Sequence, residues 1–117
     1  MAFKFEKLDV WNRAIEFGYK IHELTRDFPK EELYILTSQM KRAADSIALN
    51  IAEGSTGQTN ANFKLFIGYA IRSAIEMISC LYIGKRRAII NDITFKKLYD
   101  ETESIVRMLQ ALRTALR

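Results

Sequence analysis

The chain has 117 residues, of which 49% are apolar and 27% are charged, with one proline and five glycines. This length fits one domain with its own core, and the composition excludes a disordered or collagen-like chain. The lone Cys80 excludes an internal disulfide framework and is typical of a reducing compartment. The first residues, MAFKFEKLDVW, are not those of a signal peptide. We see no run of roughly 18 apolar residues, and we expect a cytoplasmic protein without a membrane span.

The net charge of +4 is unevenly distributed along the chain. Residues 1–58 hold eight basic and nine acidic side chains, a balance of −1, whereas residues 59–117 hold ten basic and five acidic ones, a balance of +5. A basic half favours contact with a polyanion, although many helical proteins without nucleic-acid partners reach this charge.

The first helix is predicted over residues 9–28, with Asp9 as its N-cap. Its apolar residues recur at alternating spacings of four and three, which is the pattern of one stripe facing a partner helix. These residues are Val10, Ala14, Phe17, Ile21, Leu24 and Phe28. The helix should end at Phe28, because a residue that precedes proline is disfavoured in the α region.

The second helix is predicted over residues 30–53, because Pro29 suits the start of a helix and Gly54 its end. Its apolar stripe comprises Leu33, Leu36, Met40, Ala43 and Ile47. The polar stretch 55–60 that follows is the clearest loop in the chain.

The third helix is predicted over residues 60–85 and carries two apolar stripes. The first comprises Phe63, Ile67, Ala70, Ala74, Met77, Leu81 and Gly84, and the second comprises Ile71, Ile75, Ile78 and Tyr82. Together they span roughly 200° of the helix, about twice the arc of a one-sided helix. Because a four-helix monomer should leave the second stripe uncovered, we expect it to be an oligomer interface.

The last helix is predicted over residues 92–116, with Asn91 as its N-cap. Strict spacings of three and four continue through a series that is apolar except for Thr102: Phe95, Leu98, Thr102, Ile105, Leu109, Leu112 and Leu116. No segment has the pattern of a strand. Four helices with short connections predict an all-α, up-down-up-down antiparallel four-helix bundle formed by one domain over residues 1–117.

A polar stripe borders the apolar face of the second helix. It comprises Gln39, Arg42, Ser46, Asn50 and Glu53, which lie within roughly 80° of one another. We interpret it mainly as a structural network or an interface that sets register. A solvated flank that caps the helix end and a direct ligand site are the alternatives.

Five cations surround the turn into the last helix: Lys85, Arg86, Arg87, Lys96 and Lys97. We expect them to contact RNA or DNA phosphates, although Lys and Arg at a helix C-terminus also simply complement its dipole. No pattern for base-specific readout is present.

Catalytic chemistry has little support in the sequence. The only histidine is His22 and the only cysteine is Cys80, with no signature motif around either. Glu-x-x-His pairs, zinc spacings, P-loops and dinucleotide fingerprints are absent from the sequence. We therefore predict a non-enzymatic protein without a cofactor or metal.

The segment 28–54 has the pattern F-P-x-E-E-x-Y-x-L-x-x-Q-x-x-R-A-A-x-S-I-x-x-N-I-A-E-G. It resembles the signature of a bacterial family of four-helix bundles linked to intervening sequences in large-subunit ribosomal RNA genes. The start of the chain and Phe63, Phe66, Ala70, Ser73 and Glu76 are also similar to the family. At residues 86–88, however, relatives more often have a less basic turn that contains glycine.

This resemblance implies a homopentameric ring, because members of the family associate in that way. A related branch serves diversity-generating retroelements as an accessory subunit that binds the reverse transcriptase and RNA. We therefore expect an accessory protein that associates with RNA through a basic surface. The alternative is a protein-interaction scaffold, for example one that docks a reverse transcriptase.

Overall fold

A computed structural model describes residues 2–57 and 59–117; Met1, and Gln58 of the predicted loop, lie outside the described residues. Four long helices account for most of the chain: α1 (Asp9–Thr25), α2 (Ser38–Ser55), α3 (Asn60–Arg86) and α4 (Asp92–Ala115). A short 3₁₀ turn, η1 (Lys4–Lys7), precedes them. No strand occurs in the described ranges, so the predicted all-α class with four helices is confirmed.

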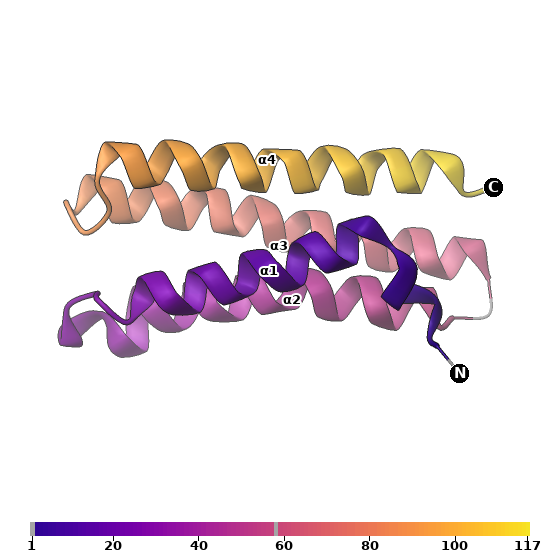
Figure 1. The fold of residues 1–117 in the computed structure, drawn as a ribbon, viewed down its shortest axis with the longest axis horizontal. Coiled ribbons are helices and arrows are strands. Elements are labelled where there is room, and N and C mark those ends of the chain that lie inside the picture. Colours follow the sequence, from indigo (N-terminus) through magenta and orange to yellow (C-terminus); the bar gives the residue numbers. More distant parts are fainter. Residues whose placement is uncertain (1, 58) are drawn as a thin grey trace.

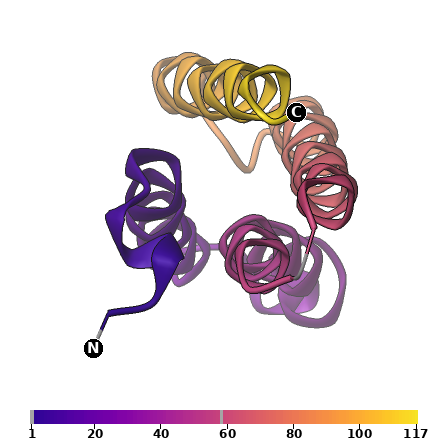
Figure 2. The ribbon, with the colours of Figure 1, turned by 90° about the vertical axis from the view of Figure 1, so that its right-hand side faces the viewer.

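The four helices lie lengthwise beside one another in a body of 43 × 24 × 19 Å. Figure 1 shows the α1–α2 and α3–α4 connections at one end, and the α2–α3 connection with both termini at the other. Viewed end-on, α2 lies between α1 and α3, and α4 lies beside α3 (Figure 2). The packing of α1 on α4 is the least extensive of the four pairings.

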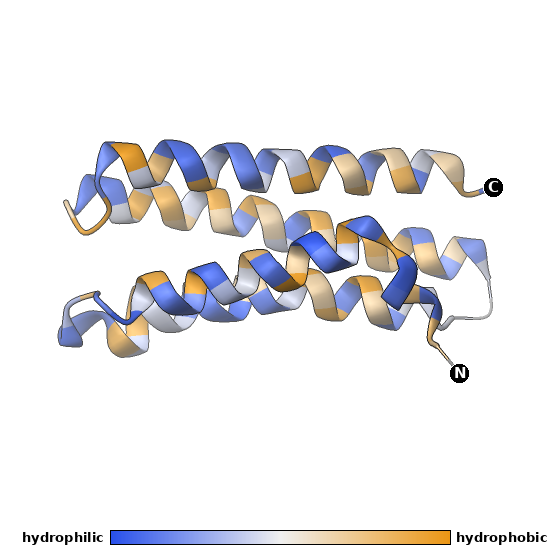
Figure 3. Cartoon of the chain, in the orientation of Figure 1, coloured by the Kyte–Doolittle hydropathy of each residue, from blue (hydrophilic) through white to orange (hydrophobic). Residues whose placement is uncertain are grey.

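The interior is filled by apolar residues from all four helices. Figure 3 shows how apolar and polar residues alternate along each helix with the period that makes one face apolar. The largest fully buried side chains are Phe17, Ile21, Met40, Ile47, Ile51, Ile67, Met77, Leu81, Thr102, Ile105 and Leu109. Each large apolar side chain buried in this way contributes about 1.5–3 kcal/mol.

The predicted second helix is three successive helical segments. Residues Lys30–Glu32 form a 3₁₀ turn (η2), Leu33–Thr37 form a π-helix (η3), and α2 begins only at Ser38. A π turn holds more residues than an α turn, so it shifts the phase of the side chains before it. Leu33 is consequently 48% exposed, and its assignment to the core stripe was wrong.

Helix boundaries differ from the prediction where tertiary contacts intervene. Helix α1 ends at Thr25, with Leu8 rather than Asp9 as its N-cap. Helix α2 runs through Gly54 to Ser55, and no glycine has a positive φ, so Gly54 does not end the helix. The predicted N-cap at Asn91 is confirmed, because its side chain accepts a hydrogen bond from the Thr94 amide at 2.8 Å.

The α3–α4 connection reverses the chain in a few residues. The amides of Ile89 and Ile90 both donate to the Gly84 carbonyl, at 2.9 and 3.1 Å. Ala88 adopts a φ of 59°, which costs a residue with a Cβ about 1–2 kcal/mol. The reversal places the Ile90 side chain in the core, where it is 3% exposed.

Helix α3 is long and apolar enough to cross a membrane by length and composition alone. One 18-residue window has a mean hydropathy of 1.4, with 39% of it buried; polar residues such as Arg72 and Glu76 interrupt the apolar sequence of the helix. Because α3 packs on both α2 and α4, we interpret it as the core helix of the bundle.

Candidate interaction surfaces

The polar stripe of α2 lies partly in the seam between α2 and α3. Ser46 is its centre, since its hydroxyl oxygen accepts hydrogen bonds from Ser73 Oγ on α3 and from Asn50 Nδ2, both at 2.9 Å. Asn50 Nδ2 also donates to the Ser46 carbonyl at 2.9 Å. Ser46, Asn50 and Ser73 are all half-buried, so the network joins the two helices.

The same seam continues at Gln39, whose amide donates to the Glu76 carboxylate on α3. We name Gln39, Ser46, Asn50, Ser73 and Glu76 the polar ladder. The other two members of the predicted stripe, Arg42 and Glu53, are exposed and make no side-chain hydrogen bond within the described residues. The geometry therefore favours helix packing as the role of Gln39, Ser46 and Asn50.

Three of the five predicted phosphate-binding cations, Lys85, Arg87 and Lys96, are partly neutralised within the chain. Lys85 Nζ lies 3.8 Å from Asp92 Oδ1 and 4.5 Å from the centre of the Phe95 ring. Arg87 Nη1 lies 3.1 Å from Oε1 of Glu32, a carboxylate only 13% exposed. Arg87 thus ties the α3–α4 connection to the start of the second helical segment.

The cations Arg86, Lys96 and Lys97 have different surroundings. Lys96 Nζ donates to Asp100 Oδ1 at 2.9 Å, and this hydrogen bond raises the pKa of Lys96. Lys97 lines a cavity between α1 and α4. Arg86 is exposed at the turn and forms no ion pair in the described part of the chain. Carboxylates of the chain therefore offset the charge of Lys85, Arg87 and Lys96.

Another set of cations, which the sequence did not single out, lies along the first half of α3 and at the end of α4. Lys64 and Arg72 lie four residues before and after Gly68, on the same face of α3. Arg113 Nη1 lies 3.7 Å from where a Cβ on Gly68 would be. Asn60 Nδ2 donates to the carbonyl of Arg117 at 3.3 Å.

We name Lys64, Arg72, Arg113 and Arg117 the basic strip. The two residues of α3 precede the other two by 41–53 positions, and only the packing of α4 on α3 brings them together. Within the sequence, only the spacing of eight residues between Lys64 and Arg72 could have indicated that these two cations share a helix face.

The second apolar stripe of α3 is divided by the fold. Ile71 is 7% exposed and Ile78 packs against the core, so the bundle itself covers both, contrary to our argument that a four-helix monomer leaves this stripe bare. Ile75 and Tyr82 remain 57% and 54% exposed. The Tyr82 ring also contacts Phe95 on α4, with centroids 5.0 Å apart. Ile75 and Tyr82 are therefore the members of the stripe that are open to a partner.

Cys80 is buried, and His22 is paired with an aspartate. Cys80 is 3% exposed, and burial, reinforced by the Glu76 charge, raises the pKa of its thiol to about 11. His22 Nε2 instead contacts Asp45 Oδ2 at 2.9 Å across α1 and α2. No metal-binding group of three or more His, Cys, Asp or Glu side chains occurs among residues 2–57 and 59–117.

Comparisons with known proteins agree with this architecture. The chain is similar in fold to a Bacteroides thetaiotaomicron protein of unknown function from the S23 ribosomal protein family, with a TM-score of 0.81 and 20% identity over 91% of this chain and 99% of that one. A search of curated proteins found no match. The family described as 23S rRNA-intervening sequence protein matches residues 6–111. The chain therefore belongs to the 23S rRNA-intervening sequence protein family.

Proposed function

We propose that this protein is a non-enzymatic cytoplasmic accessory factor that associates with RNA through the basic strip. Its protomer is an antiparallel four-helix bundle, and five copies form a ring. The observation that carries this proposal is the distribution of neutralised and unneutralised charge over α3 and α4. The link of the family to ribosomal RNA makes RNA the polyanion of choice.

Every side-chain carboxylate of residues 59–117 is engaged inside the chain. Asp92, Asp100, Glu101 and Glu103 form ion pairs, and Glu76 accepts from Gln39. Six cations in this half make no ion pair within the described residues. They are Lys64, Arg72, Arg86, Lys97, Arg113 and Arg117. The excess positive charge is therefore carried by side chains that are available to phosphates.

The basic strip suits a phosphate backbone better than a base edge. Lys64 and Arg72 project from α3 and Arg113 from α4, which lies beside it, while Arg117 follows the end of α4. The sequence has no pattern for base-specific readout. Each phosphate that such a cation neutralises releases counterions, so affinity should fall steeply with salt. Repetition of the strip around a ring multiplies the number of phosphate interactions without a new binding mode.

The ring is supported by exposed apolar residues on the outer face of α3. Leu65, Ile75, Tyr82 and Ile83 are between 39% and 57% exposed. Ile75, Tyr82 and Ile83 lie in the C-terminal half of α3, whereas Lys64 and Arg72 of the basic strip, with Leu65 between them, lie in its N-terminal half. Self-association and RNA contact can therefore use different parts of one helix.

The experiment is RNA binding measured by fluorescence anisotropy at several salt concentrations. We expect Arg72→Glu/Arg113→Glu to weaken binding at least tenfold and to lower the salt slope by about 1 for each phosphate that is no longer neutralised. Lys85→Glu/Lys96→Glu is the matched control, because it changes the net charge equally at cations that are already paired. If the control variant loses more RNA affinity than Arg72→Glu/Arg113→Glu, the RNA-binding site lies at the α3–α4 turn instead. Unchanged RNA affinity in both variants would refute RNA contact.

A protein-interaction scaffold is the second candidate, favoured by exposed apolar residues away from α3. Phe3 is 56% exposed and stacks on Phe5 with centroids 5.8 Å apart, while Tyr34 is 89% exposed. A partner such as a reverse transcriptase would dock on these residues. The scaffold is supported if a partner protein co-purifies at high salt with the wild type but not with Phe3→Ser or Tyr34→Ser. A partner that is lost when salt is raised, but is kept by both variants, would not support it.

A further inference from the structure

Gly68, in the first half of α3, differs from the other four glycines of the chain. A Cβ at each of those would lie no more than 3.1 Å from another atom, so a side chain there would force its neighbours to move. A Cβ on Gly68 would meet only Arg113 Nη1, at 3.7 Å, and no glycine has a positive φ. A glycine inside a helix lowers stability relative to alanine. Neither packing nor backbone conformation therefore accounts for Gly68.

The residues around Gly68 form a small apolar surface between cations. Leu65 and Tyr69 adjoin Gly68 on the helix surface and are 51% and 38% exposed. Lys64 and Arg72 lie four residues before and after Gly68, so they border the same surface. We name Leu65, Gly68 and Tyr69 the Gly68 patch. It is an apolar part of α3 that is enclosed by the basic strip.

The Tyr69 ring is held in place from one side. The Phe66 ring meets it edge to face, with centroids 5.3 Å apart and an interplanar angle of 79°. Phe66 itself is half-buried and packs on Gly54 of α2. A long side chain on a helix points back over the preceding turn, which directs Tyr69 towards Leu65. Because the ring is already ordered, stacking on its open side costs little conformational entropy.

The cations beside the patch are available to an anion. Arg72 and Arg113 form no ion pair within the described residues, and Arg113 Nη1 lies next to Gly68. Glu76, the carboxylate one turn after Arg72, accepts a hydrogen bond from Gln39 instead. An aromatic ring flanked by such cations suits a nucleic-acid strand, because bases stack on aromatic side chains while cations follow the backbone. Bases in a duplex are stacked on one another, so only an unpaired base can use the ring.

From this placement we infer that the Gly68 patch takes an unpaired base of single-stranded RNA. The base stacks on Tyr69 and contacts Leu65, and its flanking phosphates contact the basic strip. The bare backbone at Gly68 lets the nucleotide approach the helix closely, which is a common use of glycine at ligand sites. This inference rests on the proposed association with RNA and names the class of RNA. Since every base has a π-face, the site accepts any sequence.

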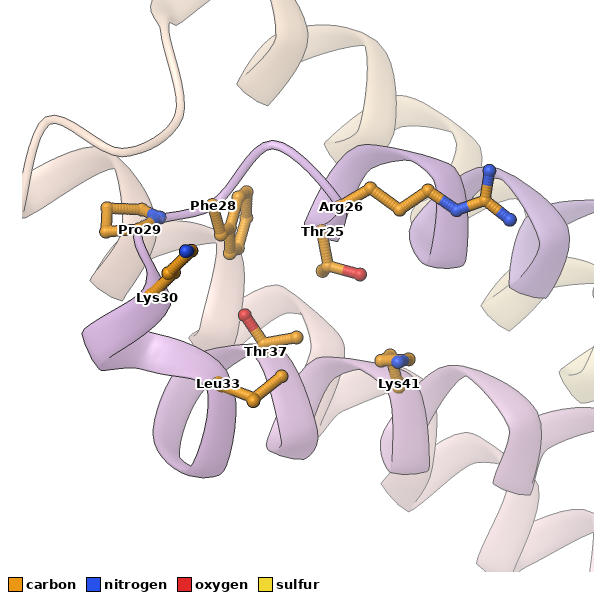
Figure 4. Close-up of a pocket in the computed structure, with 8 residues that line it drawn as sticks. All are labelled: Thr25, Arg26, Phe28, Pro29, Lys30, Leu33, Thr37 and Lys41. Carbon is orange, nitrogen blue, oxygen red and sulfur yellow. The ribbon is translucent and has the colours of Figure 1, made fainter.

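Cations at the opposite end of the bundle provide a control for charge. Lys30 and Lys41 line a cavity of about 240 Å³ beside the α1–α2 connection, together with Phe28 and Leu33. Figure 4 shows the two lysines at opposite ends of this cavity, so they do not converge on one phosphate. Lys30→Glu should therefore change RNA affinity by less than about twofold at physiological salt, where charges are screened beyond roughly 8 Å.

The test is fluorescence anisotropy with a labelled oligoadenylate of about ten nucleotides, alone and in a duplex with its complement. Gly68→Leu fills the patch without a change of charge, and Tyr69→Ala removes the ring. Each should weaken single-strand binding about tenfold and leave duplex binding unchanged. Tyr69→Phe keeps the ring and should bind like the wild type. Ala111→Leu is the control for Gly68→Leu, because Ala111 is exposed on α4 and does not share the face of Arg113.

Two further measurements separate stacking from a structural effect. The fluorescence of 2-aminopurine in the strand should fall on binding to the wild type and Tyr69→Phe, but not to Tyr69→Ala. Gly68→Leu should be at least as stable as the wild type in urea, because its Cβ has room and leucine has the better helix propensity.

The outcomes distinguish this inference from the proposed function. If Arg72→Glu/Arg113→Glu weakens RNA binding but Gly68→Leu and Tyr69→Ala do not, the basic strip binds RNA and base stacking is wrong. Equal weakening of single strand and duplex by Gly68→Leu would also overturn base stacking, because both RNAs would then be held through the backbone alone. A wild type that binds neither RNA would refute the proposed function and this inference together.

Discussion

Burial governs the chemistry of Cys80. Its thiol lies in the core of the bundle near Glu76, and both surroundings oppose the thiolate. The thiolate is the form that attacks disulfides and alkylating agents. We therefore expect Cys80 to react with a disulfide reagent at pH 8 far more slowly in the native protein than in denaturant. Equal rates in the two states, followed by absorbance, would contradict its burial.

The same thiol makes stability depend on alkaline pH. The folded pKa of about 11 exceeds the ordinary value of 9.0, so the unfolded chain loses its proton first as pH rises. The contribution of Cys80, on the order of 2 kcal/mol, is complete below pH 9 and is lost between 9 and 11. Cys80→Ala should show a smaller fall in unfolding free energy across this range.

Gly54 is required by a close approach between helices. A Cβ at this position would lie 2.5 Å from Cβ of Phe66 on α3, and that atom cannot move without its backbone. We expect Gly54→Ala to lower the unfolding free energy by about 1–3 kcal/mol in urea titrations. Gly68→Ala is the matched control, because its Cβ would meet only Arg113 Nη1 at 3.7 Å. That variant should gain about 0.5–1 kcal/mol from helix propensity.

At the scale of the elements, α2 and α3 are joined by polar as well as apolar contacts. The hydrogen bond between Ser46 and Ser73 lies in a half-buried seam, and Asn50 completes it. We expect Ser46→Ala and Ser73→Ala each to cost about 1 kcal/mol. In a double-mutant cycle the two should be coupled by at least about 0.5 kcal/mol.

Ser79→Ala provides the reference for this experiment, since Ser79 is exposed on the outer face of the same helix. It should leave stability nearly unchanged or raise it slightly, because alanine has the better helix propensity. Additive effects of Ser46→Ala and Ser73→Ala would show that the polar ladder does not hold the two helices together.

For the whole molecule, the central prediction is self-association. Light scattering should give a mass of about 68 kDa, which is five times the 13.6 kDa of one chain. Ile75→Glu places a charge on the exposed apolar face of α3 and should reduce the mass to that of smaller species. Ile93→Glu, at an equally apolar residue that is 82% exposed at the start of α4, is the control. A wild-type mass of about 14 kDa would refute the ring.

The four helices could be predicted because their signals are local. Spacings of three and four residues determine which side chains share a face, and Asn91 caps the helix that directly follows it. The core residues of α1, such as Phe17 and Ile21, follow from this pattern alone. The resemblance to the family was also visible locally, because most of its motif is a continuous run of residues within the predicted second helix.

The surfaces, in contrast, depended on which helices meet. The partner of Arg87 is Glu32, which is 55 positions away, and no local pattern reveals that this cation is neutralised. Likewise, the burial of Ile71 and Ile78 depends on their neighbours in the bundle, and Arg113 joins Lys64 and Arg72 only through the packing of α4 on α3. Helix periodicity specifies which face of each helix is apolar, and tertiary packing specifies what that face contacts. The number of helices and most of their core faces were therefore determined by the sequence alone. The π-helix before α2, the helix boundaries and the exposed charges were decided by the tertiary structure.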